Sequence, residues 1–174
     1  MGAETASSPG PPPPLLLPQA AFVGHDSFRD NLRAALIAAP QRAWPELILS
    51  DADFRDWPLG ERVVVDALQA WVRGAQRFTM LAKRFEPVAR LHPLWVEWRR
   101  LWAHKIECRA CKDADPLALP SVLWTPDWTL VRADTLVSRG QCGVDEARRI
   151  TLREQLDGWL ARSAAGFPAY TLGL

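Results

Sequence analysis

The sequence predicts a single α/β domain in which helices flank a mixed, mostly parallel sheet. Short apolar runs bounded by Pro, Gly or acidic residues, such as the run over 46–50, are typical of buried strands. These runs alternate along the chain with amphipathic stretches, and that alternation favours parallel strands joined by helices. The chain has 174 residues, of which 48% are hydrophobic, so it is long enough to bury one core.

The expected elements follow from this alternation and from the positions of Pro and Gly. The segment 83–105 is expected as a helix in two pieces, because Pro87 and Pro93 fit the first turn of a helix better than its interior. Pro40 is expected to end the first helix. Strands are expected at 20–24, 46–50, 77–82 and 106–111, a hairpin at 121–134, and helices at 27–39, 60–73, 83–105 and 144–164.

The first 19 residues differ in composition from the rest of the chain. They are rich in Pro and have no periodic apolar pattern, so residues 1–19 are predicted to be a disordered tail and residues 20–174 the domain. The four prolines at 11–14 also allow a polyproline ligand for a partner protein.

Charge and cysteine content narrow the possible classes of protein. The net charge is +1, whereas proteins that coat nucleic acid are usually far more basic, so nucleic acid is a possible but not a favoured partner. Three cysteines do not suggest a secreted disulfide scaffold. No apolar run approaches the roughly 18 residues of a membrane span, and no signal peptide is recognisable. We expect a cytoplasmic protein with no membrane partner.

A basic, Trp-rich stretch is the strongest functional signal. Residues 77–112 carry nine Lys or Arg and three Glu, a net charge of +6, whereas residues 26–61 carry a net charge of −3. Interleaved aromatic and basic side chains can bind single-stranded nucleic acid or an acidic partner, but the same spacing also fits tryptophans that pack in a core. The candidate binding residues are Trp95, Trp98, Arg99, Arg100, Trp102 and Lys105.

An acidic pair follows the apolar run over 46–50. Asp51 and Asp53 stand where the haloacid dehalogenase phosphatases carry their Mg²⁺-binding aspartates, and ligands bind at the carboxyl ends of parallel strands. Phe54 departs from that pattern, and no further Ser/Thr, Lys or acidic pair stands at a recognisable position. A Mg-dependent phosphatase is therefore the alternative enzymatic interpretation, beside a role for both aspartates in capping a turn.

The stretch HKIECRACKDAD at 104–115 suggests zinc. His104, Cys108, Cys111 and Cys142 are residue types that zinc prefers. If the stretch is a strand, however, Cys108 and Cys111 point to opposite faces, and the two residues between them include no Gly for a tight turn. We therefore predict a structural strand end, with no metal and no cofactor.

Ser50-Asp51 stands at the end of one expected strand, and Ile106-Glu107 with Arg109 lies in another. With the order of elements over roughly residues 27–134, these residues resemble one half of a phospholipase-D-like domain, of the non-catalytic kind found in bacterial proteins. The whole chain is also similar to a bacterial family of unknown function that shares DxDFxDWPLGE and the block from His92 to Cys111.

Catalytic members of the phospholipase-D-like family carry His-x-Lys-x4-Asp, which this sequence lacks, so the resemblance implies a non-catalytic domain. If Asp127 is the family's Asp, Pro120 and Val122 occupy the His and Lys positions. The predicted function is a binding or scaffold domain that acts through its basic Trp-rich helix or through self-association, with a homodimer or a protein partner possible by analogy.

Overall fold

The computed structural model describes residue 10 and residues 13–169. Its helices are α1 (His25–Arg42), α2 (Arg62–Val72), α3 (Glu86–Leu91), α4 (Pro93–Leu101) and α5 (Glu146–Ala161), with one 3-10 turn, η1 (Pro58–Gly60). Its strands are β1 (Ala20–Phe22), β2 (Glu46–Asp51), β3 (Arg77–Ala82), β4 (Ile106–Ala110), β5 (Ser121–Trp124), β6 (Thr129–Asp134), β7 (Arg139–Gly143) and β8 (Ala164–Ala165).

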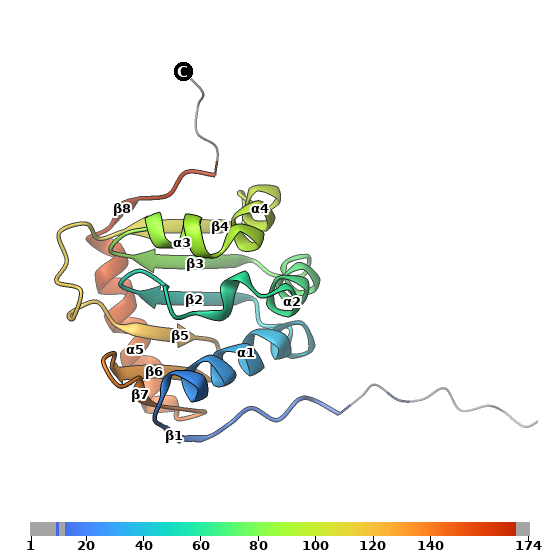
Figure 1. Cartoon of the computed structure of the whole chain (residues 1–174). Coiled ribbons are helices and arrows are strands. Elements are labelled where there is room, and N and C mark those ends of the chain that lie inside the picture. Colours follow the sequence, from blue (N-terminus) through green and yellow to red (C-terminus); the bar gives the residue numbers. More distant parts are fainter. Residues whose placement is uncertain (1–9, 11–12, 170–174) are drawn as a thin grey trace, which may run out of the picture.

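The strands form one open sheet in the order β1-β7-β6-β5-β2-β3-β4-β8 (Figure 1). The predicted α/β class is therefore confirmed. The expectation of a mostly parallel sheet is wrong, because only the β2–β3 and β3–β4 pairs are parallel and the other neighbours run antiparallel. The β2-α2-β3 and β3-α3-α4-β4 units supply the parallel centre, and the tight turns that join β5, β6 and β7 make those neighbours antiparallel.

Two strands of the sheet were not expected: β7, and β8, which lies where the expected helix over 144–164 has already ended at Ala161. β7 has the sequence RGQCG, which has no alternation of apolar residues. Its first glycine is required by packing: a Cβ on Gly140 would lie 1.9 Å from the Val131 carbonyl oxygen and 2.7 Å from the Phe22 ring. Close approach of this kind selects Gly and removes the pattern by which a strand is usually recognised.

The two faces of the sheet carry separate cores. α1 to α4 cover one face, and α5 lies behind the other (Figure 1). Phe28, Phe78, Trp57 and Trp95 fill the larger core under α1 to α4, whereas Leu156 belongs to the smaller core under α5. β2 and β3 are buried on both faces, which explains why β2 reads as a continuous apolar run.

Two boundaries differ from the expectation. α1 continues through Pro40 to Arg42, because a proline in the last turn removes only one backbone donor; Ala43 then ends the helix in the left-handed region at φ 49°. In the expected tail, residues 1–9 and 11–12 lie outside the described residues. Described residues nearby contact the domain: the Arg42 guanidinium donates to the Leu15 carbonyl, and the Trp128 indole N–H donates to the Pro18 carbonyl.

Among the described residues, no helix combines the length and apolar character needed to cross a membrane.

Candidate functional site

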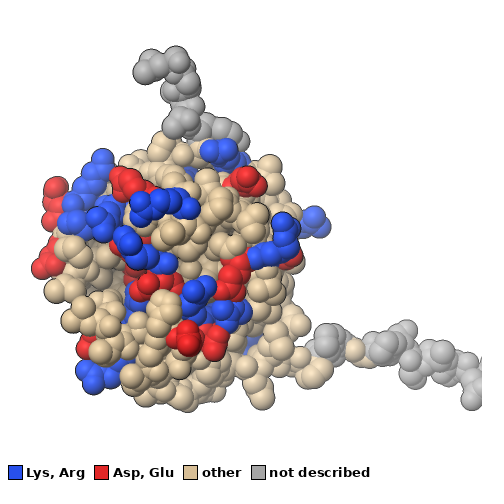
Figure 2. All heavy atoms as spheres, viewed as in Figure 1, with Lys and Arg blue, Asp and Glu red and all other residues tan. Residues whose placement is uncertain are grey.

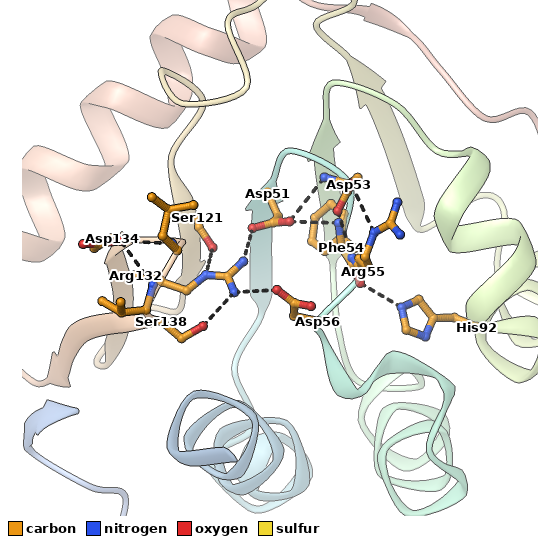
Figure 3. Close-up of polar contacts among 12 residues, drawn as sticks. Asp51, Asp53, Phe54, Arg55, Asp56, His92, Ser121, Arg132, Asp134 and Ser138 are labelled. Atoms are coloured by element: carbon orange, nitrogen blue, oxygen red, sulfur yellow. Dashed lines mark hydrogen bonds and ion pairs between the residues drawn. The ribbon is translucent and has the colours of Figure 1, made fainter. Parts of the chain in front are cut away.

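A buried arginine lies near the carboxyl end of the interior strand β2. Arg132 on β6 donates to Asp51 Oδ1 at 2.9 Å, to Asp56 Oδ2 at 3.0 Å, and to the hydroxyls of Ser121 and Ser138 (Figure 3). Its guanidinium also lies 4.0 Å from the centre of the Phe28 ring. The side chain is 3% exposed, and its charge is balanced by two carboxylates. This network joins β2, β5 and β6 to the turn before β7 and stabilises the fold.

The acidic pair expected from the sequence forms a turn. Asp51 Oδ2 accepts hydrogen bonds from the backbone N–H groups of Asp53 and Phe54, while its other oxygen accepts from Arg132 (Figure 3). The Asp53 carboxylate instead pairs with Arg55 and Arg84. Both carboxylates are thus engaged by arginines and backbone groups, as in the turn-capping interpretation, and the structure does not aim them at a shared ion.

His92 links the turn at Asp51–Phe54 to helices α3 and α4. The residue is buried between α3 and α4, and its Nε2 lies 2.8 Å from the carbonyl oxygen of Phe54, which has a positive φ of 56° (Figure 3). Burial lowers the pKa of His92 below its usual value, and the charge of Arg29 lowers it further, while the hydrogen bond to Phe54 opposes the shift. Burial therefore favours the neutral imidazole in the folded state.

A basic hollow opens beside this network, where β3 and β4 end. It has a volume of about 960 Å³ and a partly apolar wall that includes Phe85 and Phe167. Figure 2 shows Lys and Arg side chains gathered on the left of the view, where these strands end. The basic residues that line the hollow, here called the basic hollow residues, are Arg55, Lys83, Arg84, Arg90 and Lys112, with Glu86 as the acid among them.

The basic hollow residues differ in how many contacts they make with the rest of the protein. Arg84 and Arg55 lie 3.3 Å and 3.7 Å from the Asp53 carboxylate, and the Lys83 ammonium donates to the Ala114 carbonyl. Arg90 and Lys112 are exposed and form no ion pair with any other described residue. Arg55, Lys83 and Arg84 are therefore held in place by the protein, whereas the charges of Arg90 and Lys112 are available to pair with a ligand.

The chain after α5 closes one side of the hollow. Residues 163–168, here called the strap, pair with the end of β4 through β8, and Arg109 donates to the hydroxyl and the carbonyl of Ser163. Phe167 stacks on Phe85, with ring centres 5.3 Å apart. A Cβ on Gly166 would lie 2.7 Å from that of Ala110, so the strap passes too close for any other residue.

The Trp-rich helix does not present an exposed aromatic face. Trp95 and Trp98 lie in the core beneath α4, each about 6 Å from the Phe78 ring, because the i, i+3 spacing places them on the stripe that packs against β3. Trp98 and the partly buried Trp102 share one acceptor, Gln69 Oε1.

The basic candidates of this helix are also divided between core and surface. Arg99 is buried at 4% exposure, Arg100 is exposed, and Lys105 donates to the carbonyls of Val72 and Ala75. The six candidates thus form no single exposed surface, which corrects the expectation of a binding face on this helix.

The three cysteines lie inside the fold. Cys108, Cys111 and Cys142 are buried and free, and burial raises the pKa of Cys108 to about 11. Among the described residues, no three His, Cys, Asp or Glu side chains are grouped as metal ligands, and His104 is exposed and apart, with its ring beside Trp102. β4 extends to Ala110, so Cys108 faces the larger core and Cys111 the smaller one, as the strand alternation requires.

Sequence reasoning located the charge of the hollow but not the site. Lys83, Arg84, Arg90 and Lys112 all belong to the +6 segment at 77–112, but the sequence prediction places the binding residues on the Trp-rich helix within it. A usable signal was present, because Lys83 and Arg84 follow the end of β3 directly and Lys112 lies two residues after β4. Ligands of α/β sheets bind outside the carboxyl ends of parallel strands.

Fold and site together define an open, mixed α/β domain with a basic hollow at the carboxyl edge of its parallel strands. No protein-family model matches the chain, and no curated protein matches it. Among solved structures, the fold is similar to that of TrmBL2, described as an archaeal chromatin protein that shows a novel mode of DNA binding, with a TM-score of 0.63 and 14% sequence identity. The match covers 94% of this chain but only 57% of the other, and at that identity it establishes the fold alone.

Proposed function

We propose that this chain is a non-catalytic binding domain that takes the phosphate groups of a nucleic acid in the basic hollow. The observation that carries the proposal is the gathering of five basic side chains around one concave surface with a single acid among them. Phosphate contacts by Lys and Arg supply most of the affinity of such proteins, and they need no strongly basic chain overall.

Two further points support nucleic acid as the ligand class. The hollow is partly apolar, with Phe85 and Phe167 in its wall, and aromatic side chains beside basic ones suit nucleotides better than bare inorganic anions. TrmBL2, whose fold is similar to that of this chain, is a DNA-binding protein. The resemblance to a phospholipase-D-like domain stays a prediction, and the proposal assigns no residue to catalysis.

The test is the salt dependence of binding. The affinity of the full chain for a labelled single-stranded oligonucleotide is measured across a range of salt concentrations, for the wild type and for Arg90→Gln/Lys112→Gln. We expect the double variant to bind at least about tenfold more weakly, because each lost charged contact costs affinity. We also expect its log–log salt slope to be shallower by about 1.4, which corresponds to two phosphate contacts.

A matched control makes the result specific to the hollow. Arg62 and Arg73 are exposed at the two ends of α2 and do not line the hollow, so Arg62→Gln/Arg73→Gln removes the same charge elsewhere. Equal losses for the two double variants would mean that only net charge matters, and would contradict the proposal. Absence of oligonucleotide binding, with or without binding of a small phosphate compound, would contradict nucleic acid as the ligand class.

A further inference from the structure

Phe167 occupies a slot built from flat, parallel groups. Its ring is nearly parallel to that of Phe85, at an interplanar angle of 10°, and to that of Trp95, at 12°, with centres 5.3 Å and 6.5 Å away. The Arg99 guanidinium carbon lies 4.6 Å from the centre of the same ring. Aromatic faces and an arginine plane around one ring are the surroundings in which proteins hold an unstacked nucleobase.

Arg99 at this slot is poorly satisfied. The residue is buried, its Nε has no hydrogen-bond partner among the described residues, and its Nη1 donates only to the carbonyl of Phe167. Burial lowers the pKa of Arg99, although the nearby Cys108 opposes the shift. A buried N–H group without an acceptor is costly for a fold, and a ligand that offers an acceptor beside a flat ring would relieve that cost.

The segment that fills the slot is weakly attached. β8 has two residues, and Phe167 adopts a positive φ of 47°, a conformation that non-glycine residues rarely take. The strap is also held by the Arg109–Ser163 contacts, by the hydrogen bond from the Gly166 N–H to the Cys108 carbonyl, and by the Arg99–Phe167 hydrogen bond described above. The strap also lines the basic hollow, so a ring that replaced Phe167 would bring its phosphate beside the basic hollow residues.

We propose that Phe167 occupies the place of an unpaired nucleobase, which displaces the strap and stacks on Phe85 and Trp95 beside Arg99 when single-stranded nucleic acid binds the basic hollow. The inference rests on the proposed function, because the phosphates bring the base to the slot. It adds that the ligand is single-stranded and that the chain's own Phe167 competes with it. Binding of a base therefore has to overcome the docking of the strap.

The experiment compares two single-stranded oligonucleotides of equal length, one with bases and one abasic, on the full chain. In Phe167→Ala the competing ring is gone, so we expect affinity for the base-bearing strand to rise about fivefold or more, the size of one stacking contact. Affinity for the abasic strand should stay unchanged, because the basic hollow residues are intact. Loss of folding would weaken both, so tightening for one strand alone is not an effect of instability.

A second variant weakens the strap while retaining Phe167. Gly166→Ala places a methyl group 2.7 Å from the Ala110 Cβ, so we expect it to favour the base-bearing strand in the same direction. Leu136→Ala, at an exposed turn outside the hollow, is the control and should change neither affinity. An unchanged ratio of the two affinities in both variants would overturn the base slot while leaving the phosphate hollow in place. Failure of both strands to bind any of the proteins would overturn the proposed function itself.

Discussion

Arg132 and Arg99 are equally buried, at 5% and 4% exposure, but their surroundings are opposite. Arg132 has two carboxylates, two hydroxyls and one aromatic ring as partners, whereas Arg99 has one backbone carbonyl and two aromatic rings. Both lie on the face of the sheet that α1 to α4 cover. The contrast teaches that burial alone does not distinguish a structural charge from a candidate ligand-binding one; the satisfaction of its donors does.

The largest expected effect concerns Arg132, the arginine whose donors have acceptors. Arg132→Met should lower the free energy of unfolding by about 3–5 kcal/mol, because it leaves the carboxylate of Asp51 buried without its countercharge. Urea unfolding followed by circular dichroism measures the change. A loss of less than about 1 kcal/mol would mean that the network does not stabilise the fold as described.

The same substitution at the other arginine should behave differently. Arg99→Met removes a desolvated charge that no carboxylate balances and fills its space with an apolar chain. We therefore expect a free energy of unfolding within about 1 kcal/mol of the wild type, or higher. Because the substitution is identical, the pair Arg132→Met and Arg99→Met cancels the effect of side-chain size. A loss at position 99 as large as that at 132 would contradict the contrast.

A smaller effect concerns pH and His92. Since the pKa of His92 is lowered in the folded state, the unfolded chain takes up a proton first as the pH falls below about 6.5. Stability is therefore full above that pH and is lost as the pH falls toward the folded-state pKa. His92→Gln should make the urea midpoint depend less on pH between about 7.5 and 5.5.

The smallest expected effect lies in the hollow. Arg90→Gln/Lys112→Gln should change the free energy of unfolding by no more than about 0.5 kcal/mol, because both side chains are exposed and unpaired among the described residues. Thermal unfolding beside Arg62→Gln/Arg73→Gln checks this. A marked destabilisation would show that these charges hold the fold together and would weaken their assignment to a ligand.

The parallel centre of the fold could be predicted because its strands carry a strong local signal. β2 and β3 are largely apolar and β4 alternates buried with more exposed residues, and the expected limits of all three agree with the structure to within one residue. β7 could not be predicted, since the close approach to Val131 selects glycine instead of an alternating pattern. The direction of the strands around the centre depends on how β5, β6 and β7 pair, which local sequence does not encode.

The site was predictable only in part, for a similar reason. Trp95 and Trp98 look the same in sequence whether their shared face meets solvent or β3, and only packing decides between the two. Arg132 stands two residues after the buried Leu130 on β6, so strand alternation places it toward the core. Its partner Asp51 lies 81 residues away in the chain, and no local rule connects the two.

The short strands at the two margins of the sheet have a consequence for solubility. β1, with three residues, covers β7, and β8, with two, covers β4, so each longer strand is shielded from pairing with another molecule. Release of the strap would uncover the backbone of Arg109 and Ala110, which are the partners of β8. A chain that opens this margin to admit a ligand therefore exposes a template for intermolecular aggregation until the ligand, or the returning strap, covers it.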